Sequence, residues 1–267
     1  MSAAIHIPKL LGAAAAAAFA GMLFAPVPGG GHGGGTAHAE AAPHWTYEGH
    51  DGPQRWSELD PAFATCASGR SQSPIDIGSV QDSGLPPIAF DYRKATVDDV
   101  NNGHTVQFAL ANGSAITVAG RRFELLQAHF HEPSEHTVGG KSYPAELHFV
   151  HRDANGALAV VGVLIAEGEP NPVLSTLWAH LPATAGEKIL GGNSSAFDPA
   201  GLLPKERRYY SYSGSLTTPP CTEGVTWLLM QQPITASKAQ IRQFGELFAM
   251  HPTNRPVQPL NGRVVAR

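Results

Sequence analysis

Three histidines have the types and spacing for metal chemistry, and they lie in a segment that begins QAHFHEPSEH and ends ELHFVH. His129 and His131 are separated by one residue, and alternate side chains of a β-strand share a face. Both imidazoles are therefore expected to project the same way. His148 follows in a second run with β character, on the same face as Glu146. If the second run pairs beside the first, the three imidazoles form one cluster.

Three neutral imidazole nitrogens suit zinc, and a site with three protein ligands keeps a fourth position open for water, as in catalytic zinc sites. Gln127 and Glu146 each lie two residues before a candidate ligand, His129 and His148, on the same strand face. Each can accept the remaining ring N–H of that histidine and so fix its tautomer. A His-x-His pair alone is weak evidence, because ordinary polar strand faces often contain one. The pair, the third histidine and the two acceptors together predict a catalytic zinc site.

Short runs with β character are expected to position these side chains. Gly, Asn, Asp and Pro residues separate one run from the next. Strands are expected at 105–110, 115–118, 123–131, 145–150 and 158–166. One helix is expected at 173–180, because Pro172 is tolerated in a first helical turn. A second is expected after Ser237 and Gln240, which form a capping box ahead of an apolar helical face. Many strands with few helices predict a mainly β fold and not a doubly wound sheet.

Composition restricts the classes of function. The chain has 267 residues, of which 42% are hydrophobic and 15% charged. These proportions fit one globular domain with a short appendage, and they exclude a disordered polyampholyte, a collagen-like repeat and a coiled coil. The formal net charge of −4 provides no broad basic face for a phosphate backbone. No nucleic acid partner is therefore expected.

The amino-terminal segment, residues 1–39, has the pattern of a secretory signal followed by a Gly-rich stretch. Lys9 is the only Lys, Arg, Asp or Glu before an apolar run that ends at Ala25, ahead of Pro26. Small residues at Ala37 and Ala39 match the positions that a signal peptidase reads. Cleavage is expected after Ala39, leaving an exported domain, 40–267, in the periplasm or outside the cell, with no stable membrane span. The alternative is an uncleaved anchor on a glycine tether.

Two cysteines, Cys66 and Cys221, lie in the predicted exported domain. An even pair in an exported protein suggests a disulfide. The sequence alone leaves two unrelated thiols as the alternative, because it does not show whether their Cα atoms approach closely enough to bridge.

Several longer motifs occur in order along the chain: HWTYEGHDGPQRW, QSPIDI, NNGH, HFH, SEHTV, ELHFVH, GSLTTPPCTEGVTW and RPVQPL. Together they make the chain resemble an α-class carbonic anhydrase of the bacterial secreted or periplasmic type, over nearly the whole of 40–267. The resemblance implies a single domain on a large central twisted sheet, mostly antiparallel, with a few short helices. The chain departs from the animal pattern at Glu132 and Pro133, which replace a longer Trp-containing loop. The rim of the pocket is therefore expected to differ.

The resemblance implies a zinc enzyme that reversibly hydrates carbon dioxide to bicarbonate and a proton by zinc-hydroxide attack. His129, His131 and His148 are the implied ligands. Thr217 is implied to accept from the nucleophile while it donates to an ionised Glu135. His104 is implied to shuttle the proton, a role that suits a histidine with a pKa of about 6.5. Anions and sulfonamides are the expected inhibitors, and a homodimer is left open.

The resemblance also implies the rest of the pocket. The apolar residues expected to receive carbon dioxide are Val150, Val160, Leu216 and Trp227. Thr218 is expected beside them, and Tyr47, Gln107 and Gln127 match polar positions that organise water. Cys66 and Cys221 match a disulfide of many secreted members. Without the resemblance, the apolar residues would be interpreted as ordinary core, His104 as a solvated turn residue and the Thr-Thr-Pro-Pro run as a rigid surface turn.

Two other classes of function compete with hydration of carbon dioxide. One is a zinc-dependent esterase, because the same nucleophile can attack an ester. The other is a non-catalytic carbonic anhydrase-like binding protein. A protein of that second class is expected to have lost ligands, whereas this chain keeps all three histidines together with Glu135 and Thr217.

Overall fold

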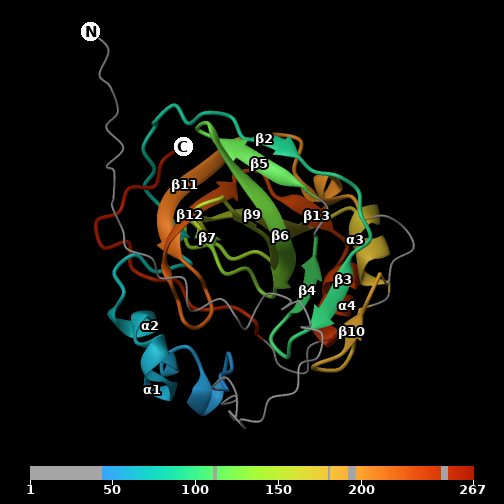
Figure 1. Ribbon diagram of the computed structural model, residues 1–267, viewed down its shortest axis with the longest axis horizontal. Coiled ribbons are helices and arrows are strands. Elements are labelled where there is room, and N and C mark those ends of the chain that lie inside the picture. The colour runs from blue at the N-terminus through green and yellow to red at the C-terminus, as the bar shows by residue number, and fades with distance from the viewer. Residues whose placement is uncertain (1–43, 111–112, 180, 192–196, 248–251) are drawn as a thin grey trace, which may run out of the picture. The chain divides into compact units, whose positions relative to one another are not determined.

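An 11-stranded twisted sheet dominates the computed structural model (Figure 1). In spatial order its main path runs through β10 Lys188–Ile189, β3 Asp98–Asn101, β4 Val106–Ala109, β6 Arg121–His131, β8 Ala145–Arg152, β9 Leu158–Glu167, β12 Glu223–Met230 and β11 Tyr209–Ser215. The strands off this path are β2 Ala89–Asp91, β5 Ala115–Val118 and β13 Ile234–Ala236. A separate two-stranded sheet joins β1 Asp76–Ile77 to β7 Thr137–Val138.

The predicted mainly β class is confirmed, and in the large sheet the parallel pairs are β9 with β12 and β9 with β13. The structure describes residues 44–110, 113–179, 181–191, 197–247 and 252–267, which fall in one unit, Pro43–Arg267. The expected amino-terminal segment, 1–39, lies outside the described residues. So do residues 180 and 248, at the ends of the two expected helices.

The helices are short. They are α1 Trp56–Leu59, α2 Thr65–Ser68, α3 Pro172–Trp178 and α4 Lys238–Leu247, with 3-10 turns at Gly49–Asp51, Pro61–Phe63 and Pro199–Leu202. The capping box before α4 forms as predicted: Gln240 N donates to Ser237 Oγ at 3.2 Å, and Ser237 N donates to Gln240 Oε1 at 3.0 Å. Within the described ranges, no helix has the length and apolar character that crossing a membrane requires.

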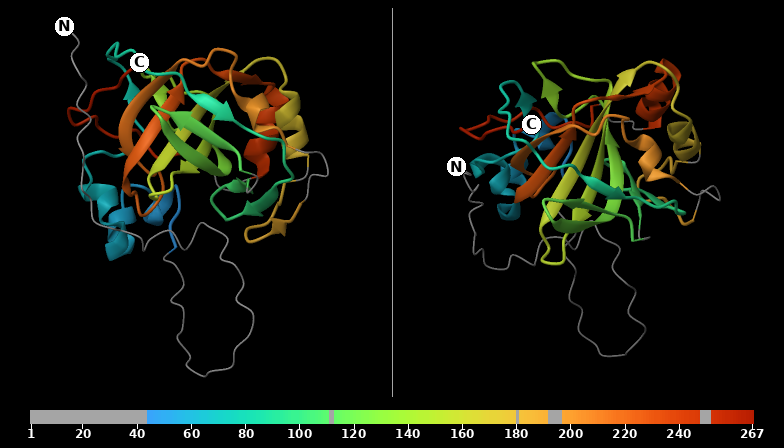
Figure 2. Two further views of the ribbon diagram at one scale, coloured as in Figure 1. Left: turned by 45° about the horizontal axis from the view of Figure 1, so that its top comes forward. Right: turned by 90° about the horizontal axis from the view of Figure 1, so that it is seen from above.

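Side chains of the central strands divide between two faces of the sheet. Phe130 on β6 and Phe149 on β8 point into the main hydrophobic core. The helices α3 and α4 contribute to this core and lie side by side, with Trp178 and Phe244 stacked at a centroid distance of 5.2 Å (Figures 1 and 2). His129 and His131 of β6 and His148 of β8 alternate with these core residues, so they lie on the opposite face. One face therefore stabilises the fold while the other is available for chemistry.

A disulfide joins Cys66 of α2 to Cys221, with a Cα–Cα distance of 5.0 Å. Both cysteines pack in a second core cluster with the aromatic rings of Trp45, Tyr47 and Trp56. The bridge therefore fastens the loop that contains Thr217 to the amino-terminal aromatic cluster.

Replacing both Cys66 and Cys221 by serine is expected to lower the free energy of unfolding by up to about 5 kcal/mol. The reason is that the bridge closes a loop with a sequence separation of 155 and so restricts the unfolded chain. Urea unfolding of the variant and of oxidised and reduced wild type measures the effect. The reduced wild type should match the variant. An unchanged unfolding midpoint in both would contradict the prediction.

Candidate metal centre

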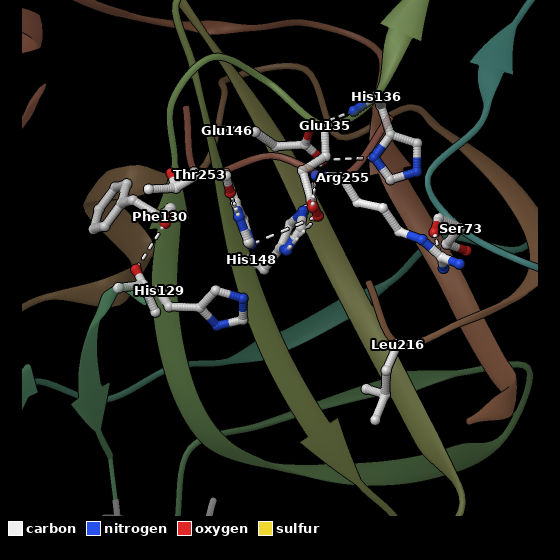
Figure 3. Close-up of polar contacts among 12 residues, drawn as sticks. Ser73, His129, Phe130, Glu135, His136, Glu146, His148, Leu216, Thr253 and Arg255 are labelled. Atoms are coloured by element: carbon white, nitrogen blue, oxygen red, sulfur yellow. Dashed lines mark hydrogen bonds and ion pairs between the residues drawn. The ribbon is translucent and has the colours of Figure 1, made fainter. Parts of the chain in front are cut away.

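The pairing of β6 with β8 brings the three candidate ligands together. His129 and His148 are directly opposite each other, and His131 lies two residues further along β6. Ring centroids are separated by 5.0 Å for His129 and His131, 5.2 Å for His129 and His148, and 4.7 Å for His131 and His148. One nitrogen of each ring lies within 4.8 Å of the others. Figure 3 shows His129 and His148 on the same side of the sheet.

The second nitrogen of each ring is occupied by an acceptor. Gln127 Oε1 lies 2.7 Å from His129 Nδ1, and Glu146 Oε1 lies 2.9 Å from His148 Nε2, as their spacing in the sequence predicted. The third acceptor is the Thr253 carbonyl oxygen, 2.6 Å from His131 Nδ1. These contacts leave Nε2 of His129, Nε2 of His131 and Nδ1 of His148 for a common ligand.

The donor set fits a zinc ion. His131 Nε2 is buried and has no hydrogen-bond partner in the part of the chain that the structure describes. Burial lowers the pKa of all three imidazoles, that of His131 to about 4 and that of His129 well below its usual range. Neutral imidazoles are the form that binds zinc, and three of them leave an open coordination position.

A second group of possible ligands adjoins the first but is already engaged. His136 Nδ1 lies 2.7 Å from Glu146 Oε1, and His136 Nε2 lies 2.6 Å from the Tyr212 hydroxyl. Both ring nitrogens of His136 are therefore occupied, and Glu146 bridges His136 to His148. This buried network orients the ligand His148. The contact with His136 fixes the Glu146 carboxylate, which then accepts from the His148 ring in a fixed direction.

Glu135 is buried beside the cluster, with Oε2 3.6 Å from His131 Nε2 and 3.9 Å from His148 Nδ1. The backbone N–H of Arg255 donates to its Oε1 at 2.9 Å. Burial raises the pKa of Glu135 to about 7, while His148, the Arg255 N–H and a hydrogen bond from the Thr217 side chain act to lower it. The carboxyl group is thus less acidic than the fully ionised Glu135 that the family resemblance implies. A divalent cation at the histidines would favour its ionised form.

The side chain of Arg255 holds this backbone N–H in place. Its guanidinium donates to the side-chain oxygen of Gln72 at 2.8 Å and to the carbonyl oxygens of Ser73 at 2.9 Å and Cys66 at 2.8 Å. Arg255 was not among the expected site residues, nor was Thr253. Thr253 contacts His131 through its backbone carbonyl oxygen, and Arg255 contacts Glu135 through its backbone N–H. The side-chain types of these two residues do not reveal such backbone contacts. The RPVQPL motif that begins at Arg255 was the available signal.

Comparison with known proteins decides the family. The family model of the eukaryotic-type carbonic anhydrases matches residues 51–267. A carbonic anhydrase from Klebsiella pneumoniae is 46% identical over 228 residues, which cover 84% of this chain and 91% of that protein. The chain belongs to the α-class carbonic anhydrase family. The carbonic anhydrase of Pectobacterium atrosepticum is 41% identical over 230 residues, 86% of this chain and 93% of that protein.

The fold agrees with this family. The carbonic anhydrase of Thermovibrio ammonificans, solved with the inhibitor sulfanilamide, superposes with a TM-score of 0.81 at 44% identity. The match covers 85% of this chain and 100% of that one. The expected single α-carbonic-anhydrase-like domain is thereby confirmed for the described residues.

Three of the four residues expected to form the apolar wall, Val150, Val160 and Trp227, form one row across the sheet of this carbonic anhydrase. Val150 is opposite Gln127 on β6 and Val160 on β9, and Val160 is opposite Trp227 on β12. Residues directly opposite each other share a face, so this row lies on the histidine face, beside His129. Val150, Val160 and Trp227 are buried. Leu216 and Thr218 lie on the loop between β11 and β12 and are half-buried.

The expected polar residues of the carbonic anhydrase pocket lie near the cluster as well. Gln107 of β4 is directly opposite His129. The ring of Tyr47 is centred 6.4 Å from that of His131 and 6.5 Å from that of His104. Its buried hydroxyl has no hydrogen-bond partner among the described residues. A buried hydroxyl without a partner is suited to holding a water molecule.

His104 differs from the sequence-based expectation. Asn102 Oδ1 accepts from the backbone N–H of His104 and shapes the turn. The imidazole stacks on Trp45, with centroids 3.6 Å apart and planes 7° from parallel. Burial, reinforced by His44, lowers the pKa of His104 to about 4. The assumption that its pKa is about 6.5 is therefore wrong for this arrangement, because a stacked, half-buried ring is poorly solvated when charged.

Proposed function

We propose that this carbonic anhydrase reversibly hydrates carbon dioxide to bicarbonate and a proton at a zinc ion held by His129, His131 and His148. The observation that carries the proposal is the set of three ring nitrogens that face one point, including a buried one without a partner. A zinc ion there would lower the pKa of a water in its open position to about 7, a value known for carbonic anhydrase itself, and so supply hydroxide at neutral pH.

Thr217 and Glu135 orient the attacking group. A hydroxyl has one donor and two acceptor positions. When the Thr217 hydroxyl donates to Glu135, it can only accept from the nucleophile. That arrangement fixes the nucleophile's proton and directs a lone pair toward the substrate. The Arg255 N–H donates to Oε1 of Glu135, so Oε2 remains to accept from Thr217.

The apolar wall holds the substrate. Carbon dioxide carries no net charge and offers only weak acceptors, so Val150, Val160 and Trp227 can bind it without leaving a polar group unpaired. Leu216 extends the wall, and Thr218 provides a polar edge for the anionic product. Water organised by Tyr47, Gln107 and Gln127 connects the reacting centre to His104.

His104 carries the proton outward in this proposal. In the stack on Trp45 its pKa is about 4, so accepting a proton from a group with a pKa of about 7 is unfavourable by roughly 10³-fold. The transfer is therefore expected with the ring turned away from Trp45, where water restores the ordinary pKa. Return of the ring to its half-buried position then serves the release step, because burial favours loss of the proton.

Replacing His104 by alanine is expected to lower kcat by roughly 10-fold or more in dilute buffer, with zinc content and kcat/KM nearly unchanged. A group with a pKa of about 7 releases protons directly to water at about 10³ s⁻¹ at most, if recombination occurs at roughly 10¹⁰ M⁻¹s⁻¹. Turnover on the order of 10⁶ s⁻¹, the value known for carbonic anhydrase, needs a relay. Added imidazole should restore much of the rate. An unchanged kcat at low buffer would assign the relay to another group.

One preparation can separate this proposal from the competing functions. Turnover of carbon dioxide and of an activated ester should be measured on the same zinc-loaded protein, with and without sulfanilamide, which is bound in the Thermovibrio enzyme. We expect hydration to be far faster than ester hydrolysis and sulfanilamide to inhibit both. Ester hydrolysis alone would support the esterase, and neither activity would support a binding protein.

We also propose that residues 1–39 are a signal removed after Ala39 and that the enzyme acts in the periplasm or outside the cell. The Cys66–Cys221 disulfide supports export, because disulfides persist in oxidising compartments. Amino-terminal sequencing of the protein recovered from a fractionated culture should begin at Glu40. A chain that keeps the apolar run would support the anchored alternative.

A further inference from the structure

A pocket outside the metal centre opens where β11 begins. Its volume is about 790 Å³, within the range of small-molecule sites. Tyr209, the first residue of β11, lines it and belongs to the main core, so the pocket lies on the face of the sheet opposite the histidines. Leu85 and Pro87 add further apolar surface. The Tyr209 hydroxyl donates to the Pro86 carbonyl oxygen at 2.6 Å, so the lining ring has no unsatisfied polar atom.

Three arginines line the same pocket, Arg207, Arg208 and Arg267, against one acidic residue, Asp82. We call it the arginine pocket. Arg267 Nε donates to Asp82 Oδ1 at 2.6 Å, and Arg208 donates to Glu206 at 2.7 Å. The lining thus keeps an excess of positive charge.

Arg207 is the source of that excess. Its guanidinium lies over the ring of Phe90, 5.3 Å from the centroid, which holds it in place. In the described part of the chain, no carboxylate pairs with it and no hydrogen bond engages its N–H groups. An exposed guanidinium without a counterion, at the edge of a pocket with apolar surface, is suited to a planar anion, because its N–H groups match the two oxygens of a carboxylate.

We propose that the arginine pocket binds an organic monocarboxylate with an apolar body. The carboxylate pairs with Arg207, and the apolar body lies against Tyr209, Leu85 and Pro87. This site is independent of the proposed function, because it lies on the other face of the sheet and shares no residue with the metal centre.

Calorimetric titration of the intact protein with 4-phenylbutyrate tests the proposal. The neutral amide, 4-phenylbutanamide, is the control for the charge. Inorganic phosphate, which has no apolar body, is the control for the apolar contact. We expect the acid to bind at least about 10-fold more tightly than either control, since a charge-assisted bidentate pair and the apolar contact are both required. Equal affinity for the acid and the amide, or for the acid and phosphate, would overturn the proposal.

Substitutions assign the binding to this pocket. Arg207→Gln should weaken 4-phenylbutyrate binding by about 10-fold or more, and Asp82→Asn should tighten it because Arg267 loses its competing carboxylate. Arg242→Gln, the same change at an exposed site on α4 that does not line the pocket, should leave the affinity unchanged. Hydration of carbon dioxide should stay at the wild-type rate in all three. An unchanged affinity in Arg207→Gln would overturn the proposal, because the acid would then bind elsewhere, for example at the metal centre.

Discussion

Replacing His148 by alanine is expected to remove most of the bound zinc and to abolish most of the hydration of carbon dioxide. Two imidazoles would remain, and loss of an outer-shell partner alone typically lowers metal affinity by 10–100-fold. Loss of a ligand should therefore exceed about 100-fold. Elemental analysis gives zinc per chain, and stopped-flow hydration measures activity on the same sample.

Two further variants make this result interpretable. His148 is buried, so alanine leaves a cavity, and His148→Gln keeps more of the volume while it still removes the ring nitrogen. His50→Ala changes an exposed histidine outside the cluster and should keep zinc and activity. If both His148 variants fold and keep one zinc per chain with full turnover, the assignment of this ligand is wrong.

Replacing Thr217 by valine is expected to keep zinc but to lower kcat/KM for hydration by roughly 10²-fold, the scale of losing an orienting group. Valine preserves the volume and removes the hydroxyl that we propose connects the nucleophile to Glu135. Thr218→Val, the same change one residue later, should have a much smaller effect. Hydration kinetics with zinc analysis on each variant provide the measurement.

A double substitution tests the link between these two residues. If Thr217 and Glu135 act as one relay, Glu135→Gln should add little to the loss already caused by Thr217→Val, since residues in one hydrogen-bond network are not additive. Fully multiplicative effects would show that the two residues act separately. A silent Thr217→Val would remove the relay from the mechanism.

Local patterns were sufficient to predict five of the strands, β4, β5, β6, β8 and β9, and the histidine face. Alternation along β6 placed His129 and His131 together, and the ring acceptors Gln127 and Glu146 followed from the same two-residue spacing. The capping box of α4 is equally local, because both partners lie within one helical turn. The alternation of side chains along a strand and the contacts within one helical turn depend only on residues that are close in the sequence.

Long-range and register features could not be predicted in this way. The acceptor for His131 is a backbone oxygen 122 residues away, at Thr253, and the donor to Glu135 is 120 residues away. A bulge between Leu125 and Gln127 shifts the register of β6 against β8, so these two residues face opposite sides although strict alternation puts them together. The low pKa of His104 depends on its burial, which only the fold determines.

Metal removal and reconstitution test the central claim most directly. The protein should be stripped of metal by a chelator and zinc restored stepwise, with zinc per chain and the rate of carbon dioxide hydration measured at every step. We expect a metal-free protein without measurable hydration, a rate that rises in proportion to bound zinc, and a plateau at about one zinc per chain, as one cluster of three imidazoles requires. Full turnover by the metal-free protein, or zinc binding that the rate does not follow, would contradict it.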